Sequence, residues 1–270
     1  MIVNSYAYAA GGYDADAQAF FTAAGISDSG QKSAVNTLVL ALKSDGIWSR
    51  CSAIYPFVGG SSSSHAVNLK TPGTYDLTFY GGLTHSSTGM LPDGSTGYAD
   101  TGIVPSSALA TSDTHLSYYS RTANTTNGYD IGCFNTANYH ALGLGCYYSS
   151  AGDTGFSFAY DGSFGYDAAV LPAASNTNSS GFYVGSRISA SHHVLYKNGT
   201  AGTVNTLLTG DFPSITDTVK IGCMSHNGTP LIWGNRECAF ASIGAGLSGA
   251  QVTSLTNAVQ TFQTSLSRQV

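Results

Sequence analysis

The sequence predicts a mainly β protein, an antiparallel β-sandwich with a helical hairpin before it and a single helix after it. Short runs rich in Tyr, Val, Ile and Thr recur along the chain, and Gly, Asn, Asp and Ser separate them. Turn dipeptides such as Asn198-Gly199 are typical of hairpins. Many short strands with such turns favour a sandwich or barrel and exclude a parallel α/β sheet. The predicted strands are Tyr75–Tyr80, Leu116–Arg121, Tyr129–Phe134, Tyr139–Tyr148, Gly155–Tyr160, Gly181–Ile188, His192–Lys197, Val219–Met224 and Cys238–Ile243.

Two helices are predicted ahead of the strands. The first spans Ala15–Ala24, and a glycine follows it as a stop signal. The second spans Asp28–Asp45, where Asp28 is placed as the N-cap and Gln31 completes a capping-box pattern. Its apolar residues are three and four positions apart and share one helical face: Val35, Leu38 and Leu42. Such a stripe must be buried against another element.

A third helix is predicted at the C-terminal end. Ser248 and Gln251 repeat the capping-box pattern, and we expect the helix to pack against the sandwich or the second helix. Both ends of the chain would then form a small helical subassembly, pinned by Trp48 and Phe57, with Gln31–Gly60 outside the jelly roll. The apolar stripe of this third helix is Val252, Leu255, Val259, Phe262 and Leu266.

The composition limits the classes of partner. Only 9% of the residues are charged, against roughly 25% in ordinary soluble domains, so hydroxyl and amide side chains must cover much of the surface. The net charge of −5 gives no basic footprint, and we expect no nucleic-acid partner. No run of about 18 apolar residues occurs, so we expect no membrane insertion.

The five cysteines show no zinc spacing, and their odd number argues against a complete disulfide framework. If Phe134 pairs with Tyr139 across a hairpin, Cys133 falls opposite His140 and not opposite Cys146. We therefore expect the cysteines to be buried free thiols that pack as small apolar side chains.

Four stretches in order along the chain carry a resemblance to a known fold. They are GMLPDGSTGYADTG (89–102), HLSYYSRT (115–122), HHVLYKNGT (192–200) and CAFASIGAGLSGAQVTSLTNAV (238–259). Together they resemble the laminin-G-like, concanavalin A-like lectin/glucanase jelly roll, although Gln251 replaces its usual acidic residue. The resemblance implies a jelly-roll sandwich over residues 61–270 that ends in a helix. Residues 1–60 would form an N-terminal segment with two helices, packing on or beside the sandwich.

The front of the chain carries a second resemblance. QKSAVNTLVLALKSDGIWSRCSAIYPFVGG (31–60), HSSTGMLPDGSTGYADT (85–101) and the ending FQTSLSRQV are similar to a group of uncharacterised proteins of tailed phages and prophages. Such proteins are regarded as tail, fibre or head-appendage components. The resemblance implies a virion location, release by host lysis in place of a signal peptide, and other virion proteins as partners. We also expect a homo-oligomer, with a trimer favoured.

The sequence argues against catalysis. Glucanases of the resembled fold use two glutamates, whereas this chain has one, Glu237. The close aspartate pairs are Asp161 with Asp167 and Asp93 with Asp100. Asp93 and Asp161 precede glycine in turns, where an Asx-turn explains them without catalysis. The histidines show no metal-ligand spacing. We expect no catalytic residues, no metal and no cofactor, and the alternative for the metal is a structural calcium ion to which Asp153, Asp211 and Asp217 contribute.

Carbohydrate binding is the chemistry that the aromatic loops favour. A sugar ring needs an aromatic platform for its face, and amide or hydroxyl groups for its edges. Trp233 lies in the loop MSHNGTPLIWGNRE and is the best local match, although packing in the core is the alternative for this side chain. The candidate glycan-binding residues are Trp233, His226, Asn227, Asn235, Tyr160 and Tyr166.

The first functional interpretation is a non-catalytic structural or adhesion protein on the surface of a phage particle, binding host-surface glycans. One alternative is a secreted, extracellular carbohydrate-binding module. The other is a glycan hydrolase with an aspartate site, such as Asp161 with Asp167. Ordered copies on a particle would support the first interpretation. A glycan-array signal without a particle would favour the second, and product release that depends on these aspartates would favour the third.

Overall fold

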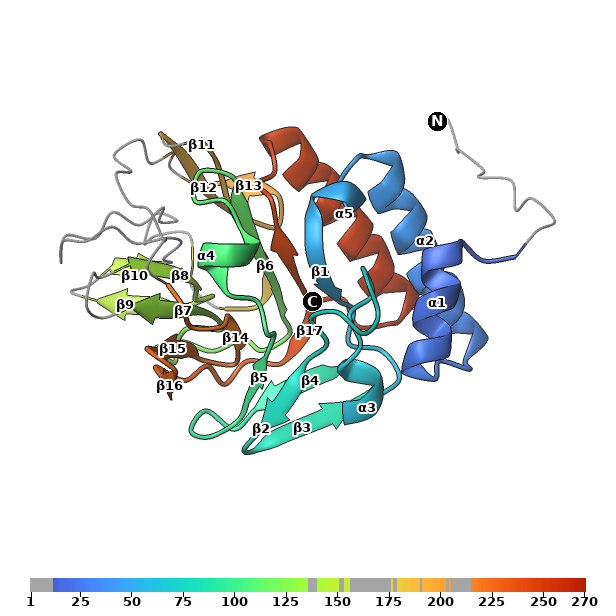
Figure 1. The fold of residues 1–270 in the computed structure, drawn as a ribbon, viewed down its shortest axis with the longest axis horizontal. Coiled ribbons are helices and arrows are strands. Elements are labelled where there is room, and N and C mark those ends of the chain that lie inside the picture. Colours follow the sequence, from blue (N-terminus) through green and yellow to red (C-terminus); the bar gives the residue numbers. More distant parts are fainter. Residues whose placement is uncertain are drawn as a thin grey trace.

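The computed structural model arranges the chain in three layers (Figure 1). It describes residues 12–135, 140–150, 153–155, 176, 179–189, 191–202, 204 and 215–270. Helices form one outer layer, an eight-stranded sheet forms the middle, and a seven-stranded sheet forms the other outer layer. The predicted mainly β sandwich with helices from both ends of the chain is therefore confirmed.

The middle layer is an antiparallel sheet with the order β13-β12-β11-β6-β17-β4-β3. β1 also pairs with β17, so the early and late parts of the chain meet in this sheet. Its strands are β1 (Cys51–Tyr55), β3 (Leu83–Ser86), β4 (Gly89–Pro92), β6 (Thr114–Ser120), β11 (Gly181–Ser189), β12 (His192–Lys197), β13 (Thr200–Ala201) and β17 (Cys238–Gly244).

The second sheet has the order β16-β15-β7-β14-β5-β2, and β8 pairs with β7. β15 runs parallel to β7, with Met224 opposite Gly132, so this sheet is mixed and the prediction of antiparallel pairing fails at this one contact. Its strands are β2 (Thr78–Tyr80), β5 (Tyr98–Asp100), β7 (Ile131–Asn135), β8 (His140–Leu144), β14 (Lys220–Ile221), β15 (Met224–His226) and β16 (Thr229–Leu231). A separate pair consists of β9 (Tyr148–Ser150) and β10 (Asp153–Gly155).

The central strands of the eight-stranded sheet bury side chains on both faces. On β6, Tyr118 points into the core between the sheets, whereas Tyr119 points towards the helices. On β11, Tyr183 and Phe182 divide in the same way. Neighbouring residues of a strand face opposite ways. Two consecutive aromatic residues in these strands therefore correspond to a sheet that is covered on both faces.

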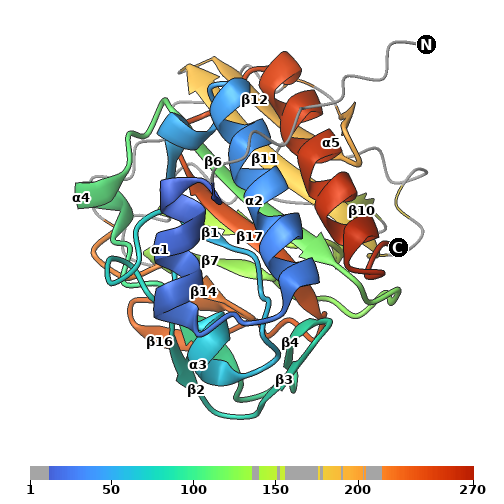
Figure 2. The ribbon, with the colours of Figure 1, turned by 90° about the vertical axis from the view of Figure 1, so that its right-hand side faces the viewer.

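The helical layer consists of α1 (Ala15–Ala24), α2 (Ser29–Ser44) and α5 (Gly249–Ser265), which cross the outside of the sheet (Figure 2). Both predicted N-caps are present, since Asp28 accepts from the Gln31 N–H and Ser248 forms a capping box with Gln251. The capping box predicted at Asp28 is not completed, because the Gln31 side chain accepts from the Gly59 N–H instead. Three short elements are η1 (Trp48–Arg50), α3 (Ser62–His65) and α4 (Pro105–Ala108). Within the described residues, each helix is too short or too polar to cross a membrane.

The helices from the two ends of the chain lie side by side, as predicted. The stripes of α2 and α5 share one apolar cluster with α1 and the outer face of the eight-stranded sheet. Trp48 belongs to this cluster, and the ammonium groups of Lys43 and Lys70 lie 5.4 and 4.6 Å from the centroid of its ring. The layer is therefore built from both ends of the chain.

Two expectations about the segment before residue 60 are wrong. Phe57 does not pin the helices, since it lies in the core between the two sheets. Cys51–Tyr55 is not outside the sandwich, because it forms β1 and pairs with β17. Ala53 and Tyr55 are buried in the core between the sheets, and Ile54 between them is buried towards the helices, as a strand covered on both faces requires. The domain division at residue 60 stays a prediction.

All five cysteines are buried free thiols. The predicted register around Cys133 is wrong by two residues: Cys133 lies opposite Leu142, and Phe134 lies opposite Ala141. Asn135 now lies opposite His140, so the turn falls one residue later along the chain than predicted. Burial raises the pKa of the Cys51 and Cys223 thiols to about 12, so they remain protonated at neutral pH.

His115 on β6 is a buried histidine that the fold holds neutral. Its Nδ1 lies 2.6 Å from the Ala245 carbonyl oxygen, and its Nε2 lies 3.0 Å from Ser242 Oγ. Burial lowers the pKa of His115 to about 4, although the carbonyl contact raises it in part. Because an unfolded histidine has a pKa of about 6.5, the unfolded chain binds more protons between these values.

The free energy of unfolding should therefore be highest above about pH 6.5 and should fall by up to ~1.4 kcal/mol per pH unit for His115 as the pH drops towards 4. Urea unfolding at pH 7, 6 and 5 measures this slope. His115→Gln should flatten it by that amount. Leu231→Ala, an exposed and non-ionisable change, should keep the wild-type slope. An unchanged slope in His115→Gln would contradict the assignment.

Candidate functional site

An aromatic row crosses the outer face of the seven-stranded sheet. It consists of Tyr80 on β2, Tyr98 on β5 and Trp233 in the loop after β16. The Tyr80 and Tyr98 rings are stacked, with centroids 4.9 Å apart and an angle of 14° between their planes. The centroids of Tyr98 and Trp233 are 6.2 Å apart, and their planes are tilted by 50°. Tyr80 is 46% exposed and the other two are partly exposed, so a ligand can reach the row.

Strand alternation and register place the two tyrosines on this face. Phe79 and Ala99 pack towards the core between the sheets, so their neighbours point outward. Tyr80 lies directly opposite Tyr98 in the β2–β5 pairing. Directly opposed aromatic residues also stabilise a strand pair, by roughly 0.2–1 kcal/mol. The first part of the row therefore follows from one strand pairing.

The Trp233 loop is clamped against the start of β7. The Tyr129 N–H donates to the Ile232 carbonyl at 3.2 Å, and the Gly234 N–H donates to the Gly222 carbonyl at 2.9 Å. A Cβ atom at Gly128 would lie 2.2 Å from the Trp233 carbonyl oxygen, so this close approach requires glycine. The backbone of Trp233 is therefore fixed from both sides.

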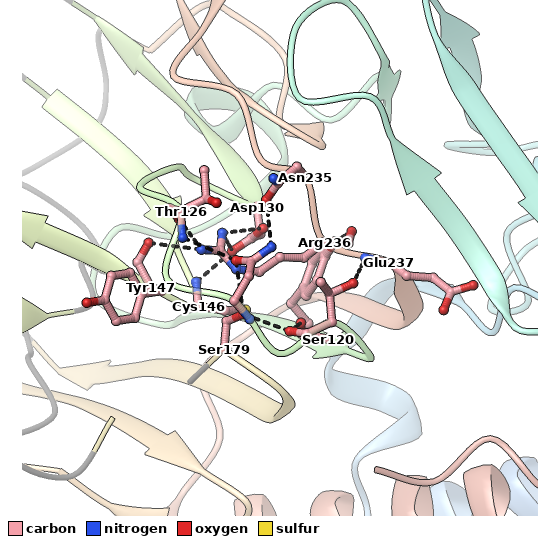
Figure 3. Close-up of polar contacts among 12 residues, drawn as sticks. Ser120, Thr126, Asp130, Cys146, Tyr147, Ser179, Asn235, Arg236 and Glu237 are labelled. Atoms are coloured by element: carbon pink, nitrogen blue, oxygen red, sulfur yellow. Dashed lines mark hydrogen bonds and ion pairs between the residues drawn. The ribbon is translucent and has the colours of Figure 1, made fainter. Parts of the chain in front are cut away.

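A buried ion pair anchors the same loop (Figure 3). Arg236 Nη1 lies 3.1 and 3.2 Å from the two carboxylate oxygens of Asp130, and both side chains are fully buried. Arg236 also donates to the carbonyl oxygens of Thr126 and Tyr147, while Asp130 accepts from the Cys146 N–H at 2.6 Å. Burial alone would lower the pKa of Arg236, but the Asp130 carboxylate raises it above its usual value, so the guanidinium stays charged.

An acid–base cluster lies beside the row. Ile221 packs inward, so its neighbour Lys220 points to the outer face, where Asp100 lies opposite it. Lys220 Nζ is 2.9 Å from Asp217 Oδ1 and 3.7 Å from Asp100 Oδ2. Burial lowers the pKa of Lys220, but the two carboxylates outweigh it and raise the pKa. The ammonium is therefore charged and held between two acids.

A cleft of about 390 Å³ adjoins Asp217 on the same sheet. Its described lining residues are Phe134, Asn135, Thr216, Asp217, Asn227 and Gly228. His226 packs against the Phe134 ring with centroids 4.8 Å apart, and burial lowers its pKa. Asn227 has a φ of +50° in the turn between β15 and β16, where asparagine is tolerated. Of the described residues predicted for glycan binding, Asn227 therefore lines the cleft, and His226 precedes it on β15.

The structure distributes the predicted site residues over two places. Trp233 joins the aromatic row, and Asn235 follows it, with Oδ1 accepting from Asn124 Nδ2 at 3.0 Å. Asn227 lines the cleft, and His226 precedes it on β15 and packs against Phe134. The two remaining predicted residues, Tyr160 and Tyr166, lie outside the described residues. The set as a site stays a prediction.

Sequence reasoning missed Tyr80 and Tyr98 as site residues. Tyr80 ends a predicted strand, and Tyr98 lies in the GYAD part of a recognised motif. Period-two alternation indicates that each can face away from the core. The missing step is the pairing between β2 and β5, since the hairpin of β3 and β4 separates them in the sequence.

The aspartate pair Asp93 and Asp100 serves local structure. The Asp93 carboxylate accepts from the Thr96 hydroxyl and from the backbone N–H groups of Thr96, Gly97 and Ser95, which keep its pKa well below the usual value. Asp100 Oδ1 accepts from the Gly102 N–H. Asp161 and Asp167 lie outside the described residues. In the described ranges, no group of three or more His, Cys, Asp or Glu side chains is arranged to hold a metal ion.

Comparisons with known proteins support the fold. No protein-family model and no curated protein matches the chain. Domain 4 of AbnA, a GH43 extracellular arabinanase from Geobacillus stearothermophilus solved in complex with arabinotriose, is 14% identical with a TM-score of 0.52. The alignment covers 77% of this chain and 98% of that domain. This likeness shows a shared jelly-roll sandwich.

Two further structures align over much of this chain. The receptor-binding domain of a botulinum neurotoxin C/D mosaic serotype is 10% identical with a TM-score of 0.49, over 78% of this chain and 52% of that one. The Trypanosoma rangeli sialidase in complex with the inhibitor DANA is 12% identical with a TM-score of 0.49, over 82% of this chain and 38% of that one. This chain thus spans about half of the toxin domain and less of the sialidase.

Replacing Asp130 by Asn should destabilise the protein by about 3–5 kcal/mol, because it leaves the buried Arg236 charge without its counterion. Asp113→Asn is the matched control, since Asp113 pairs with Arg50 where both side chains are partly exposed. It should cost no more than ~1 kcal/mol. Chemical denaturation of both variants measures the difference. Equal costs would contradict the role of Arg236–Asp130 as the anchor of this loop.

Proposed function

We propose that this protein is a non-catalytic glycan-binding protein and that the aromatic row of Tyr80, Tyr98 and Trp233 is its binding platform. The observation that carries the proposal is the contact of three partly exposed rings on one sheet face. Aromatic rings supply a large apolar area with few rotatable bonds, and the Tyr hydroxyl and Trp N–H add polar atoms at the ring edges. Sugars present matching apolar C–H faces and polar rims.

The polar groups beside the row suit the rim of a sugar. Asn124 orients the side-chain amide of Asn235, two residues after Trp233, by donating to its Oδ1. A Cβ atom at Gly94 would lie 3.1 Å from Asn235 Cβ, so Asn235 borders the 93–97 turn that leads to Tyr98. An oriented amide next to an aromatic ring can fix a sugar hydroxyl, as specific polar groups do in small-molecule sites.

The fold supports the same proposal. The AbnA domain with arabinotriose has a comparable jelly-roll sandwich, with a TM-score of 0.52. Its 14% identity gives no residue-by-residue guide to a site, so the binding residues are proposed from the geometry of this chain alone. The structural roles of Asp93 and Asp100 favour binding without catalysis.

The proposed place of action is the surface of a phage particle, next to other virion proteins. This part rests on the sequence resemblance of residues 31–60, 85–101 and the C-terminal ending. A homo-oligomer, with a trimer favoured, belongs to the same proposal. Imaging of phage particles would show the chain in ordered copies, and sedimentation of the purified protein would give its oligomeric state. A glycan-binding chain that no particle carries would favour a secreted, extracellular module.

Tyr98→Ala and Trp233→Ala should each weaken glycan binding about tenfold or more, because aromatic residues at the centre of an interface carry much of the binding energy. Tyr80→Ala should have a smaller effect, since Tyr80 is the most exposed ring. Binding to a glycan array that includes arabinotriose identifies ligands, and titration calorimetry quantifies them.

Leu40→Ala is the control for these variants, because Leu40 is 46% exposed on α2 in the opposite layer. It should bind like the wild-type protein. Thermal unfolding checks that each variant is folded. Full binding by a folded Tyr98→Ala, Trp233→Ala double variant would exclude the aromatic row as the site.

A further inference from the structure

The basic residues of the chain are placed away from the aromatic row or are already paired. The chain has ten Lys and Arg residues, and all of them lie in described ranges. Lys220 is paired with Asp217, and Arg236, in the loop that carries Trp233, is buried against Asp130. The other eight lie in the helical layer, in the eight-stranded sheet or in segments next to these: Lys32, Lys43, Arg50, Lys70, Arg121, Arg187, Lys197 and Arg268.

Lys220 offers little charge to a ligand. Its side chain is 4% exposed, and its ammonium contacts Asp217 Oδ1 and Oγ1 of Thr218 at 2.9 and 3.0 Å. Asp100 contributes a second carboxylate at 3.7 Å. Two carboxylates around one ammonium leave this cluster with a net negative charge.

A third carboxylate borders the row. The Asp93 turn links β4 to Tyr98, and a Cβ atom at Gly82 would lie 2.2 Å from Asp93 Oδ2, so Asp93 also sits against the turn that follows Tyr80. Its bonds to backbone N–H groups favour the ionised form. Asp217 is likewise held ionised by Lys220 and by the Gly228 N–H. The rim of the row is therefore anionic.

We infer that this face takes neutral glycans and disfavours glycans that carry carboxylate or sulfate groups. The inference rests on the proposed glycan-binding function and names the ligand class of the same site. An acidic sugar on the row would meet Asp93, Asp100 and Asp217 with one neutralised ammonium among them. Like-charge contacts of this kind give specificity by repelling the wrong partner.

The test uses the full chain on an array of neutral oligosaccharides, each printed beside a counterpart that carries sialic acid, uronate or sulfate. Each acidic counterpart should bind roughly tenfold more weakly, because its charge is repelled by the carboxylates beside the row. Raising the salt concentration from about 0.01 M to about 1 M shortens the Debye length from ~30 Å to ~3 Å. It should therefore reduce the difference in affinity between the neutral and the acidic member of each pair.

Asp100→Asn should raise binding of the acidic member relative to the neutral member of each pair. Asn can keep the contact with the Gly102 N–H, and Asp100 is the partner of Lys220 with the longer ion-pair distance. Asp45→Asn is the matched control, because it makes the same charge change at the exposed end of α2. It should leave the ratio within each pair as in the wild type.

The outcomes separate the inference from the proposal beneath it. Equal or tighter binding of acidic glycans, still lost in Tyr98→Ala, would overturn the neutral preference and leave the glycan-binding function standing. If neither salt nor Asp100→Asn changes the difference in affinity between neutral and acidic glycans, the electrostatic origin of the preference would also be overturned. Absence of any glycan binding, or binding that survives loss of both Tyr98 and Trp233, would overturn the function and the inference together.

Discussion

The outer face of the sandwich depends on the ion pair between Arg236 and Asp130. Burying two charges costs several kcal/mol per ion, and attraction offsets this only with good geometry and further hydrogen bonds. Here the carbonyl oxygens of Thr126 and Tyr147 and the N–H of Cys146 supply those bonds. The groups come from separate segments, so these bonds to the pair form together only when all of the segments are in place. The ion pair thereby determines the conformation of the Trp233 loop as well as stabilising it.

The helical layer decides which sheet face is left for a ligand. α2 and α5 cover one face of the eight-stranded sheet, and the second sheet covers the other. Near the C-terminus, the buried Arg268 donates to the carbonyl oxygens of Phe57 and Pro56 at 2.7 and 3.2 Å, which ties the end of the chain to the segment after β1. Because both faces of that sheet are used for packing, the outer face of the seven-stranded sheet is the sheet face that we propose for ligand contact.

Local signals predicted the helices well, because a capping box and a stripe lie within a few turns of one segment. Asp28 and Ser248 are the N-caps that their sequences indicate. Strand register depends on distant partners, and there the sequence was less informative. The pairing of Cys133 with Leu142 depends on the position of the turn along the chain, which no turn motif specifies. Phe57 was misplaced because an apolar residue after a helix does not indicate which of two cores will bury it.

The candidate site also combines a residue that local sequence indicates with residues whose role depends on distant partners. Trp233 stands out in the sequence as an aromatic residue in a polar loop, whereas Tyr98 becomes part of a platform only when β5 pairs with β2. The same holds for charged residues. From the sequence alone, a lysine in a strand is expected to be a cation on the surface, but the fold places Asp217 and Asp100 around Lys220. Composition predicts a weakly charged surface, with 9% charged residues. The sign of the electrostatic field at the aromatic row depends on which few charged side chains the fold brings together there. The proposed preference for neutral glycans therefore follows from the folded arrangement of these charges and not from the composition.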